Sequence, residues 1–146
     1  MGCDIHGFIE VKHKGKWECY DKIPLRTRNY DLFSLIAGIR GNEKPISEPK
    51  GIPEDVSEIV KAEFKSWKED AHTPTWLSSK ESNEVYKKFD KIVKRDLKNQ
   101  GKEEKDAWLV YGIDSFVYQL DTYGSYFLKE NLVKYEDVRI VIWFDN

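Results

Sequence analysis

The segment EDVRIVIWFDN, residues 136–146, determines the fold class more clearly than any other part of the chain. Most side chains between positions 138 and 145 are β-branched or aromatic, and such residues are enriched in strands. Successive side chains of a strand point to opposite sides of the sheet, so a run that is apolar throughout is buried on both faces. The segment therefore predicts a central strand over residues 138–145.

The opposite end of the chain supplies a partner for this strand. In CDIHGFIEV, residues 3–11, the apolar side chains Ile5, Ile9 and Val11 share one face, and Asp4, His6, Phe8 and Glu10 share the other. This is the two-residue period of a half-buried strand. A turn containing a glycine follows, and then the short strand KWECY. We expect a hairpin of residues 3–12 and 16–20, paired with the central strand.

Helical patterns fill the middle of the chain. They predict helices over residues 30–39, 53–67 and 78–101, and one long or broken helix within 104–132. Residues 41–55 are rich in proline and glycine and form a long loop, which makes them a candidate site wall. Residues 68–82 interrupt the helical pattern. The sequence thus predicts a single α+β domain, 1–146, with a small antiparallel sheet from the two termini and three or four helices against it.

Local signals fix where two of these helices begin and end. Asn29 or Asp31 is the expected N-cap of the first, and Gly38 or Gly41 its stop. In the charged helix that closes at residue 101, Ser78 and Glu81 have the spacing of a capping box.

Composition narrows the classes of function. Hydrophobic residues make up 40% and charged residues 34% of the 146, with a net charge of −2, which is typical of a globular protein. Without a basic excess we expect no binding of duplex nucleic acid, and without a long apolar run no membrane span. No leader segment is evident, so Cys3 and Cys19 are expected as reduced thiols in a cytoplasm.

Two D-x-H motifs are the main candidates for chemistry in a chain with 3 histidines. Asp4 and His6 lie on one face of the first predicted strand, about 7 Å apart from the rise per residue, and Cys3 points to the other face. Asp70 and His72 form the second motif. Such pairs hold metals in some phosphoesterases, or act as acid and base. The other segments of a metallophosphoesterase are missing from the sequence, so structural hydrogen bonding by these side chains is an open alternative.

Polar and aromatic residues around the first predicted helix and the long loop are candidates for ligand binding. Guanidinium groups and helix N-termini favour phosphate, and aromatic rings stack on bases. The alternatives are ordinary surface ion pairs and packing in the core. Together with the two D-x-H motifs, the candidate ligand-binding residues are Arg26, Arg28, Asn29, Tyr30, Arg40, Lys50 and Trp76.

Several strings in the chain resemble a family of small phage-encoded and prophage-encoded proteins that begin with MGCDIH. The strings are MGCDIH, RNYDLF, AGIRG, PISEPKGIPED, DAHTPTWLS and VRIVIWFDN, and the charged segment 79–105 matches least. The resemblance implies a phage protein acting in the host bacterial cytoplasm and implies nothing about its mechanism. By analogy, small phage accessory proteins with a polar pocket often counter host defence by holding or cleaving nucleotide-derived signals.

The sequence leaves three functions open. We expect a non-enzymatic anti-defence protein that sequesters a small nucleotide-derived ligand without a cofactor, in a pocket lined by arginines and aromatic rings. The alternative is a phosphodiesterase or other hydrolase that depends on a divalent metal and uses Asp4, His6, Asp70 and His72 as ligands or as acid and base. The third is an inhibitor that binds a host enzyme. A homo-oligomer is compatible with all three.

Overall fold

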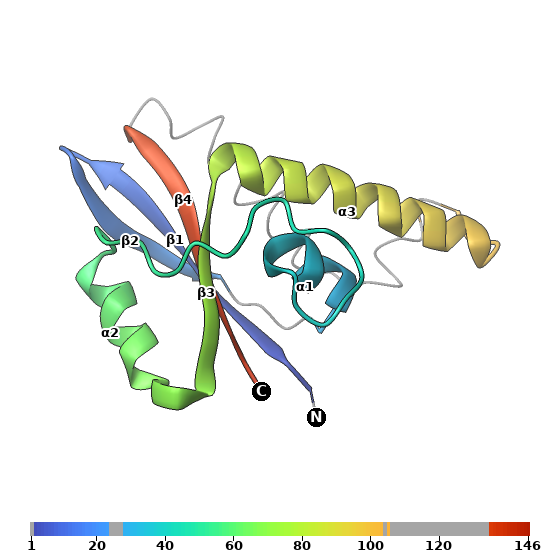
Figure 1. The fold of residues 1–146 in the computed structure, drawn as a ribbon. Helices are drawn as coiled ribbons and strands as arrows, with labels where there is room; N and C mark the ends of the chain where they lie inside the picture. Colours follow the sequence, from blue (N-terminus) through green and yellow to red (C-terminus); the bar gives the residue numbers. More distant parts are fainter. Residues whose placement is uncertain (1, 24–27, 104, 106–134) are drawn as a thin grey trace.

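A sheet of four antiparallel strands in the order β2-β1-β4-β3 organises the structure (Figure 1). The computed structural model describes residues 2–23, 28–103, 105 and 135–146. Its strands are β1 (Asp4–His13), β2 (Lys16–Ile23), β3 (Ala71–Ser78) and β4 (Asp137–Asp145). The helices are α1 (Tyr30–Ala37), α2 (Glu58–Ser66) and α3 (Ser79–Asn99), with a short 3₁₀ helix, η1 (Lys68–Asp70), before β3. The predicted α+β class is confirmed.

The predicted hairpin of the N-terminal segment is formed by β1 and β2. Its two loop residues, Lys14 and Gly15, have positive φ angles of 51° and 74°. Turns with this backbone conformation match the twist of paired strands, and glycine adopts it at little cost. The register shifts between Ile9, which pairs with Asp21, and Glu10, which pairs with Cys19, so Tyr20 is the extra residue of a bulge in β2.

The C-terminal strand β4 is central, as the sequence predicts. It pairs with β1 from Asp4 opposite Asp145 to Lys12 opposite Asp137, and its other edge pairs with β3. All residues from 138 to 144 are buried. Because β4 runs antiparallel to both neighbours, its last residues lie beside the first residues of β1 and β3. We call this end of the strands the terminal end of the sheet, because both chain termini lie there (Figure 1).

The prediction that residues 68–82 only interrupt the helical pattern is wrong, because this segment contains strand β3. The segment 71–78 pairs with β4 and forms an edge of the sheet. Its alternation is broken by a register shift between His72 and Thr75, where Pro74 lies and Thr73 has a φ of 49°. Proline is tolerated at edges and bulges, but the bulge removes the strict two-residue period from the sequence. The sheet therefore has an additional strand that comes from neither terminus.

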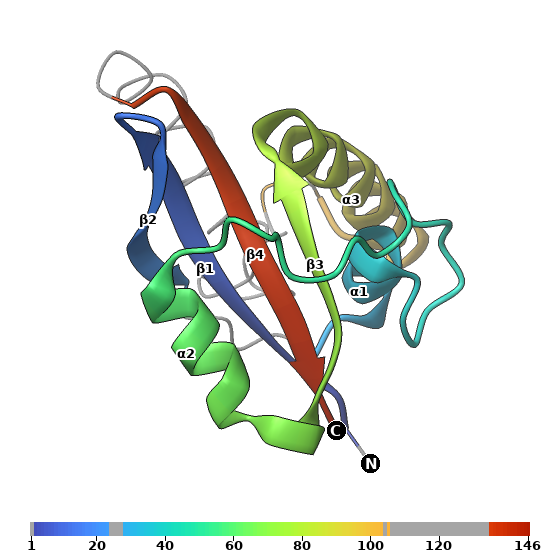
Figure 2. The ribbon, with the colours of Figure 1, turned by 60° about the vertical axis from the view of Figure 1, so that its left-hand side comes forward.

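The two faces of the sheet carry different layers, as the turned view shows (Figure 2). Helices α1 and α3 cover one face, where Ile5, Ile142 and Phe144 belong to the larger buried cluster. Helix α2 lies on the other face, over a smaller cluster of Phe8, Val60, Val141 and Trp143. We call these the α1/α3 face and the α2 face. Cys3 is buried on the α1/α3 face, opposite to Asp4 and His6, as predicted.

The helix ends confirm most of the local signals. The Asn29 side chain accepts a hydrogen bond from the Leu32 amide, and Gly38 closes α1 in the left-handed conformation. Ser78 and Glu81 form the predicted capping box of α3. The second helix is shorter than predicted, because it begins at Glu58 after the N-cap Ser57 and not at residue 53. None of the described helices combines the length and apolar character needed to cross a bilayer. The predicted helix within 104–132 lies outside the described residues, except for position 105.

Candidate functional site

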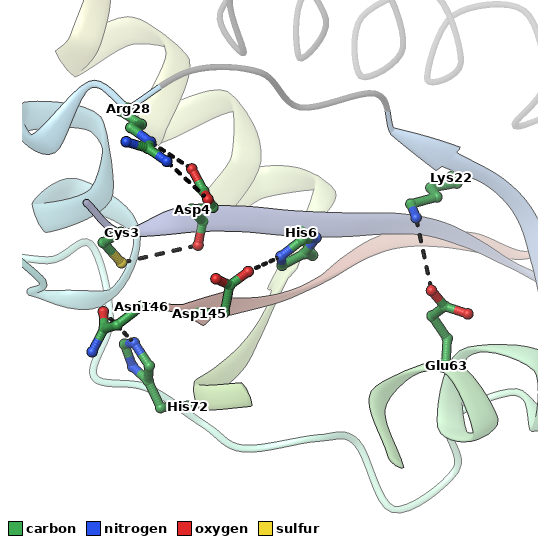
Figure 3. A network of polar contacts seen from close by, with 9 residues as sticks. All are labelled: Cys3, Asp4, His6, Lys22, Arg28, Glu63, His72, Asp145 and Asn146. Carbon is green, nitrogen blue, oxygen red and sulfur yellow. Dashed lines mark hydrogen bonds and ion pairs between the residues drawn. The ribbon is translucent and has the colours of Figure 1, made fainter. Parts of the chain in front are cut away.

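Both side chains of the first D-x-H motif form ion pairs within the protein at the terminal end (Figure 3). The His6 imidazole bonds to the Asp145 carboxylate of β4, while its ring lies 4.2 Å from the Trp67 ring between centroids. Asp4 receives two hydrogen bonds from the Arg28 guanidinium, of 2.6 and 3.2 Å. These bonds lower the pKa of Asp4, chiefly through the Arg28 hydrogen bond. Both side chains of the motif thus have partners from distant parts of the chain.

The second D-x-H motif does not join the first. His72 pairs with Phe144 in the sheet and stacks on its ring at 6.2 Å, which puts it on the α1/α3 face. Its Nε2 lies 3.0 Å from the Asn146 side-chain oxygen, whereas His6 bonds to Asp145 on the α2 face. Asp70 is exposed in η1. The described residues therefore do not bring the four candidate metal ligands together, and no three His, Cys, Asp or Glu side chains among them form a group that fits a metal.

The predicted anion-recognition edge is occupied by contacts within the protein. Arg40 reaches the Asn146 side chain at 3.3 Å, and the Lys50 ammonium lies 2.6 Å from Glu81. Asn29 caps α1, and the Tyr30 hydroxyl accepts a hydrogen bond from the backbone of Cys3 at 3.2 Å. Arg26 lies outside the described residues. These side chains tie the chain segments together, and any phosphate would have to compete with their present partners.

A cavity of about 470 Å³ opens on the α2 face at the end of the sheet opposite to the terminal end. Two tryptophans from the outer strands line it, Trp17 at the start of β2 and Trp76 near the end of β3. The remaining lining residues come from the long loop and from the ends of β3 and β4, and they are Pro53, Glu54, Asp55, Ser78, Asp137, Val138 and Arg139. We call it the Trp17–Trp76 cavity.

Arg139 forms the floor of this cavity. Its guanidinium carbon lies 3.9 Å from the ring centroid of Trp17 and 5.8 Å from that of Trp76. The residue is 4% exposed, and its Nε donates to the buried Glu10 carboxylate at 2.8 Å. Its Nη1 and Nη2 donate to the side chain and backbone oxygens of Asp55, at 2.8 and 3.3 Å. All three guanidinium nitrogens therefore have partners inside the protein. The hydrogen bond from Arg139 is the main cause that lowers the pKa of Asp55.

Hydrogen bonds on both sides of residues 52–54 hold the long loop that forms a wall of the cavity. On one side of residues 52–54, the Lys50 amide donates to the Thr75 hydroxyl at 3.1 Å and the Gly51 amide to the Pro74 carbonyl at 3.0 Å. On the other side, the Ser57 amide donates to Glu10 at 2.7 Å. The loop thus supplies a cavity wall, as its proline- and glycine-rich sequence suggested.

Trp76 is supported from the side of α3. The Lys50 ammonium lies 3.5 Å from the Trp76 ring centroid, and Lys50 itself does not line the cavity. Burial alone would raise the pKa of Glu81. Hydrogen bonds from the Lys50 ammonium and the Ser78 amide outweigh burial and lower this pKa from 4.5 to about 2. A cation held by an ionised carboxylate therefore covers one of the cavity's tryptophans.

Comparisons of the chain with models of protein families, with curated proteins and with solved structures find no match. The chemistry of the site therefore rests on its own residues. Among the predicted residues, Trp76 lines the cavity and Lys50 adjoins it. Trp17, Glu10 and Arg139 were missed. A signal for Arg139 was present in the sequence, because a charged residue in an otherwise apolar strand indicates a buried ion pair.

Proposed function

We propose that the protein is a non-enzymatic binding protein that sequesters a small nucleotide-derived ligand, with the base of the ligand in the Trp17–Trp76 cavity. The observation that carries the proposal is the combination of two tryptophan walls with polar side chains around a cavity of about 470 Å³. Ligand pockets commonly have volumes of roughly 300–1,000 Å³ and combine aromatic walls with a few polar groups. Stacking on an aromatic side chain is a general way to hold a base.

The charges of the cavity determine which part of the ligand enters. Glu54, Asp55 and Asp137 are carboxylates, and Arg139 is the lining cation. Since Arg139 is already bonded to Glu10 and Asp55, the described residues that line the cavity offer no unpaired guanidinium to attract a phosphate. The base therefore points inward and the phosphates stay in solvent at the mouth. This differs from the sequence-based expectation that arginines would bind the phosphates.

The position of the D-x-H motifs favours binding over hydrolysis. His6 and His72 face opposite sides of the sheet, and both lie at the terminal end, away from the cavity. A ligand in the cavity is thus out of reach of these imidazoles, so neither can transfer a proton to it. If the protein acts in a phage-infected cell, as its resemblance implies, holding the ligand intact lowers the free concentration of a signal.

A depletion experiment tests the proposal. The purified protein is mixed with a panel of cyclic and linear nucleotides, and the free concentrations are measured by mass spectrometry before and after heat denaturation. We expect one or a few nucleotides to be depleted and then released unchanged. Trp76→Ala is expected to abolish depletion, whereas Tyr20→Ala, which removes an exposed ring outside the cavity, leaves it intact. Release of a cleaved product, or depletion that survives Trp76→Ala, would contradict the proposal.

A further inference from the structure

The carboxylates that line the Trp17–Trp76 cavity, Glu54, Asp55 and Asp137, are exposed side chains that supply hydrogen-bond acceptors to a ligand. Glu54 has no hydrogen bond or ion pair with any other described residue and lies on the cavity wall. One oxygen of Asp137 accepts from the Val138 amide at 2.8 Å, which leaves the other oxygen available. The Ser78 hydroxyl oxygen already accepts from the Glu81 amide at 3.2 Å. A ligand that bonds to the Glu54 or Asp137 carboxylate must supply N–H or O–H donors.

We propose that the cavity recognises a planar group with two adjacent N–H donors, as on the Watson–Crick edge of guanine. This inference rests on the proposed function and specifies the class of base. Guanine presents N1–H and the 2-amino group side by side, which matches the two oxygens of one carboxylate. The guanidinium group of an arginine-like ligand has the same pair of donors and also suits a tryptophan wall. Guanine and a guanidinium ligand would thus be recognised by the same pair of hydrogen bonds, and the experiment below distinguishes between the two ligands.

Other bases fit the same acceptors less well. Adenine presents one amino group next to the N1 acceptor, so a carboxylate paired with the amino group would face the lone pair of N1. Hypoxanthine has N1–H but lacks the 2-amino group, so one carboxylate oxygen loses its donor. An analogue that lacks one of the two donors forms one charged hydrogen bond fewer with the carboxylate. We expect guanosine to bind at least about tenfold more tightly than inosine or adenosine, which corresponds to a single charged hydrogen bond.

Calorimetric titration of the full chain with four probes tests this inference. The probes are guanosine, inosine, adenosine and agmatine. Each is titrated into the unmodified protein and into the double variant Glu54→Gln with Asp137→Asn. The control variant is Glu84→Gln, which changes an exposed residue of α3. Circular dichroism of each variant confirms that it is folded. We expect guanosine to bind best, the double variant to lose this preference, and the control to keep it.

The possible outcomes distinguish this inference from the proposed function. If all three nucleosides bind equally, or if the double variant keeps the preference for guanosine, the donor-pair recognition is wrong and the binding of a nucleotide stands. If agmatine binds and no nucleoside does, the donor-pair recognition stands and the nucleotide ligand is wrong. If none of the four probes binds, the donor-pair recognition is wrong, and the proposed function is wrong as well if the depletion experiment finds no nucleotide that binds.

Discussion

The guanidinium carbon of Arg139 lies 3.9 Å above the ring centroid of Trp17, in a cavity whose other tryptophan, Trp76, comes from the opposite edge of the sheet. Arg139 belongs to the central strand and bonds to Glu10 on the neighbouring strand. It also bonds to Asp55 in the long loop. One buried side chain therefore connects the sheet, a tryptophan and the loop that walls the cavity, and the shape of the cavity depends on it.

The first prediction concerns this buried ion pair. Arg139→Met leaves the Glu10 carboxylate, which is 0% exposed, without its cation. Removal of one partner of a buried pair typically costs about 3–5 kcal/mol in the free energy of unfolding. Urea denaturation measures this loss. The double variant Arg139→Met with Glu10→Leu should recover a substantial part of it, because no buried charge remains unpaired. A loss below about 1 kcal/mol in the single variant would show that the pair is not buried as described.

The second prediction concerns Glu81 and acid. Its pKa is lowered from 4.5 to about 2 in the folded state, so its contribution to stability is complete above pH 4.5 and is lost as the pH falls toward 2. A shift of about 2.5 pKa units, at about 1.4 kcal/mol per unit, makes this contribution about 3–4 kcal/mol. Glu81→Gln keeps a residue suited to the capping box but removes the charge that pairs with Lys50.

Thermal unfolding at pH 7 and at pH 2 checks the effect of Glu81. The variant should be less stable than the unmodified protein at pH 7, and the difference should nearly disappear at pH 2. Glu84→Gln, which removes an exposed charge from the same helix, serves as the control and should have little effect at either pH. A stability difference that is equal at the two pH values would mean that the charge of Glu81 is not the cause.

The third prediction concerns the two histidine motifs. His6→Ala and His72→Ala remove side chains that bond to Asp145 and Asn146 at the terminal end and do not line the cavity. We expect each variant to bind the ligand found in the depletion experiment with a dissociation constant within about twofold of the unmodified protein, while stability falls by about 1 kcal/mol from the lost hydrogen bond. Loss of ligand binding in both folded variants would contradict this prediction and would show that the ligand binds at the terminal end.

The fourth prediction concerns the thiols. Burial raises the pKa of both Cys3 and Cys19, and neither forms a disulfide. A raised pKa lowers the fraction of thiolate, which is the reactive form. At pH 8 we expect both thiols of the native protein to react with a disulfide reagent roughly tenfold or more slowly than a free cysteine, with the half-buried Cys19 ahead of the fully buried Cys3. Rapid reaction of Cys3 without denaturant would contradict its position in the core.

The regular elements could be predicted because their signals are local. A few neighbouring residues are enough to predict the cap of α1 at Asn29, the capping box at Ser78 and the apolar run of β4. Strand β3 was missed because its bulge near Thr73 and Pro74 breaks the alternation. Pairing with β4 nevertheless stabilises the segment as an edge strand, and such tertiary support leaves no regular period in the sequence.

The candidate site was harder to predict than the fold, because its contacts join residues far apart in the chain. Asp145, the partner of His6, is 139 positions away, and Glu10 is 129 positions from Arg139. The sequence left open whether His6 lies beside the second D-x-H motif. The strand register keeps the two histidines apart, because Phe144 and Asp145 are consecutive residues of β4 and face opposite sides of the sheet. Phe144 stacks on His72, and Asp145 bonds to His6. Of the candidate residues and segments predicted from the sequence, Trp76 and the long loop line the cavity.

The most direct test of the central claim is the response of the tryptophan indole N–H signals in a two-dimensional NMR spectrum as guanosine 5′-monophosphate is added. The chain has 5 tryptophans, and single Trp→Phe variants assign their signals. Trp17 and Trp76 line the cavity, whereas Trp67 and Trp143 pack around His6 near the terminal end. We expect saturable shifts for Trp17 and Trp76 and unchanged signals for Trp67 and Trp143. Shifts confined to Trp67 and Trp143, or no shift at any signal, would contradict the central claim.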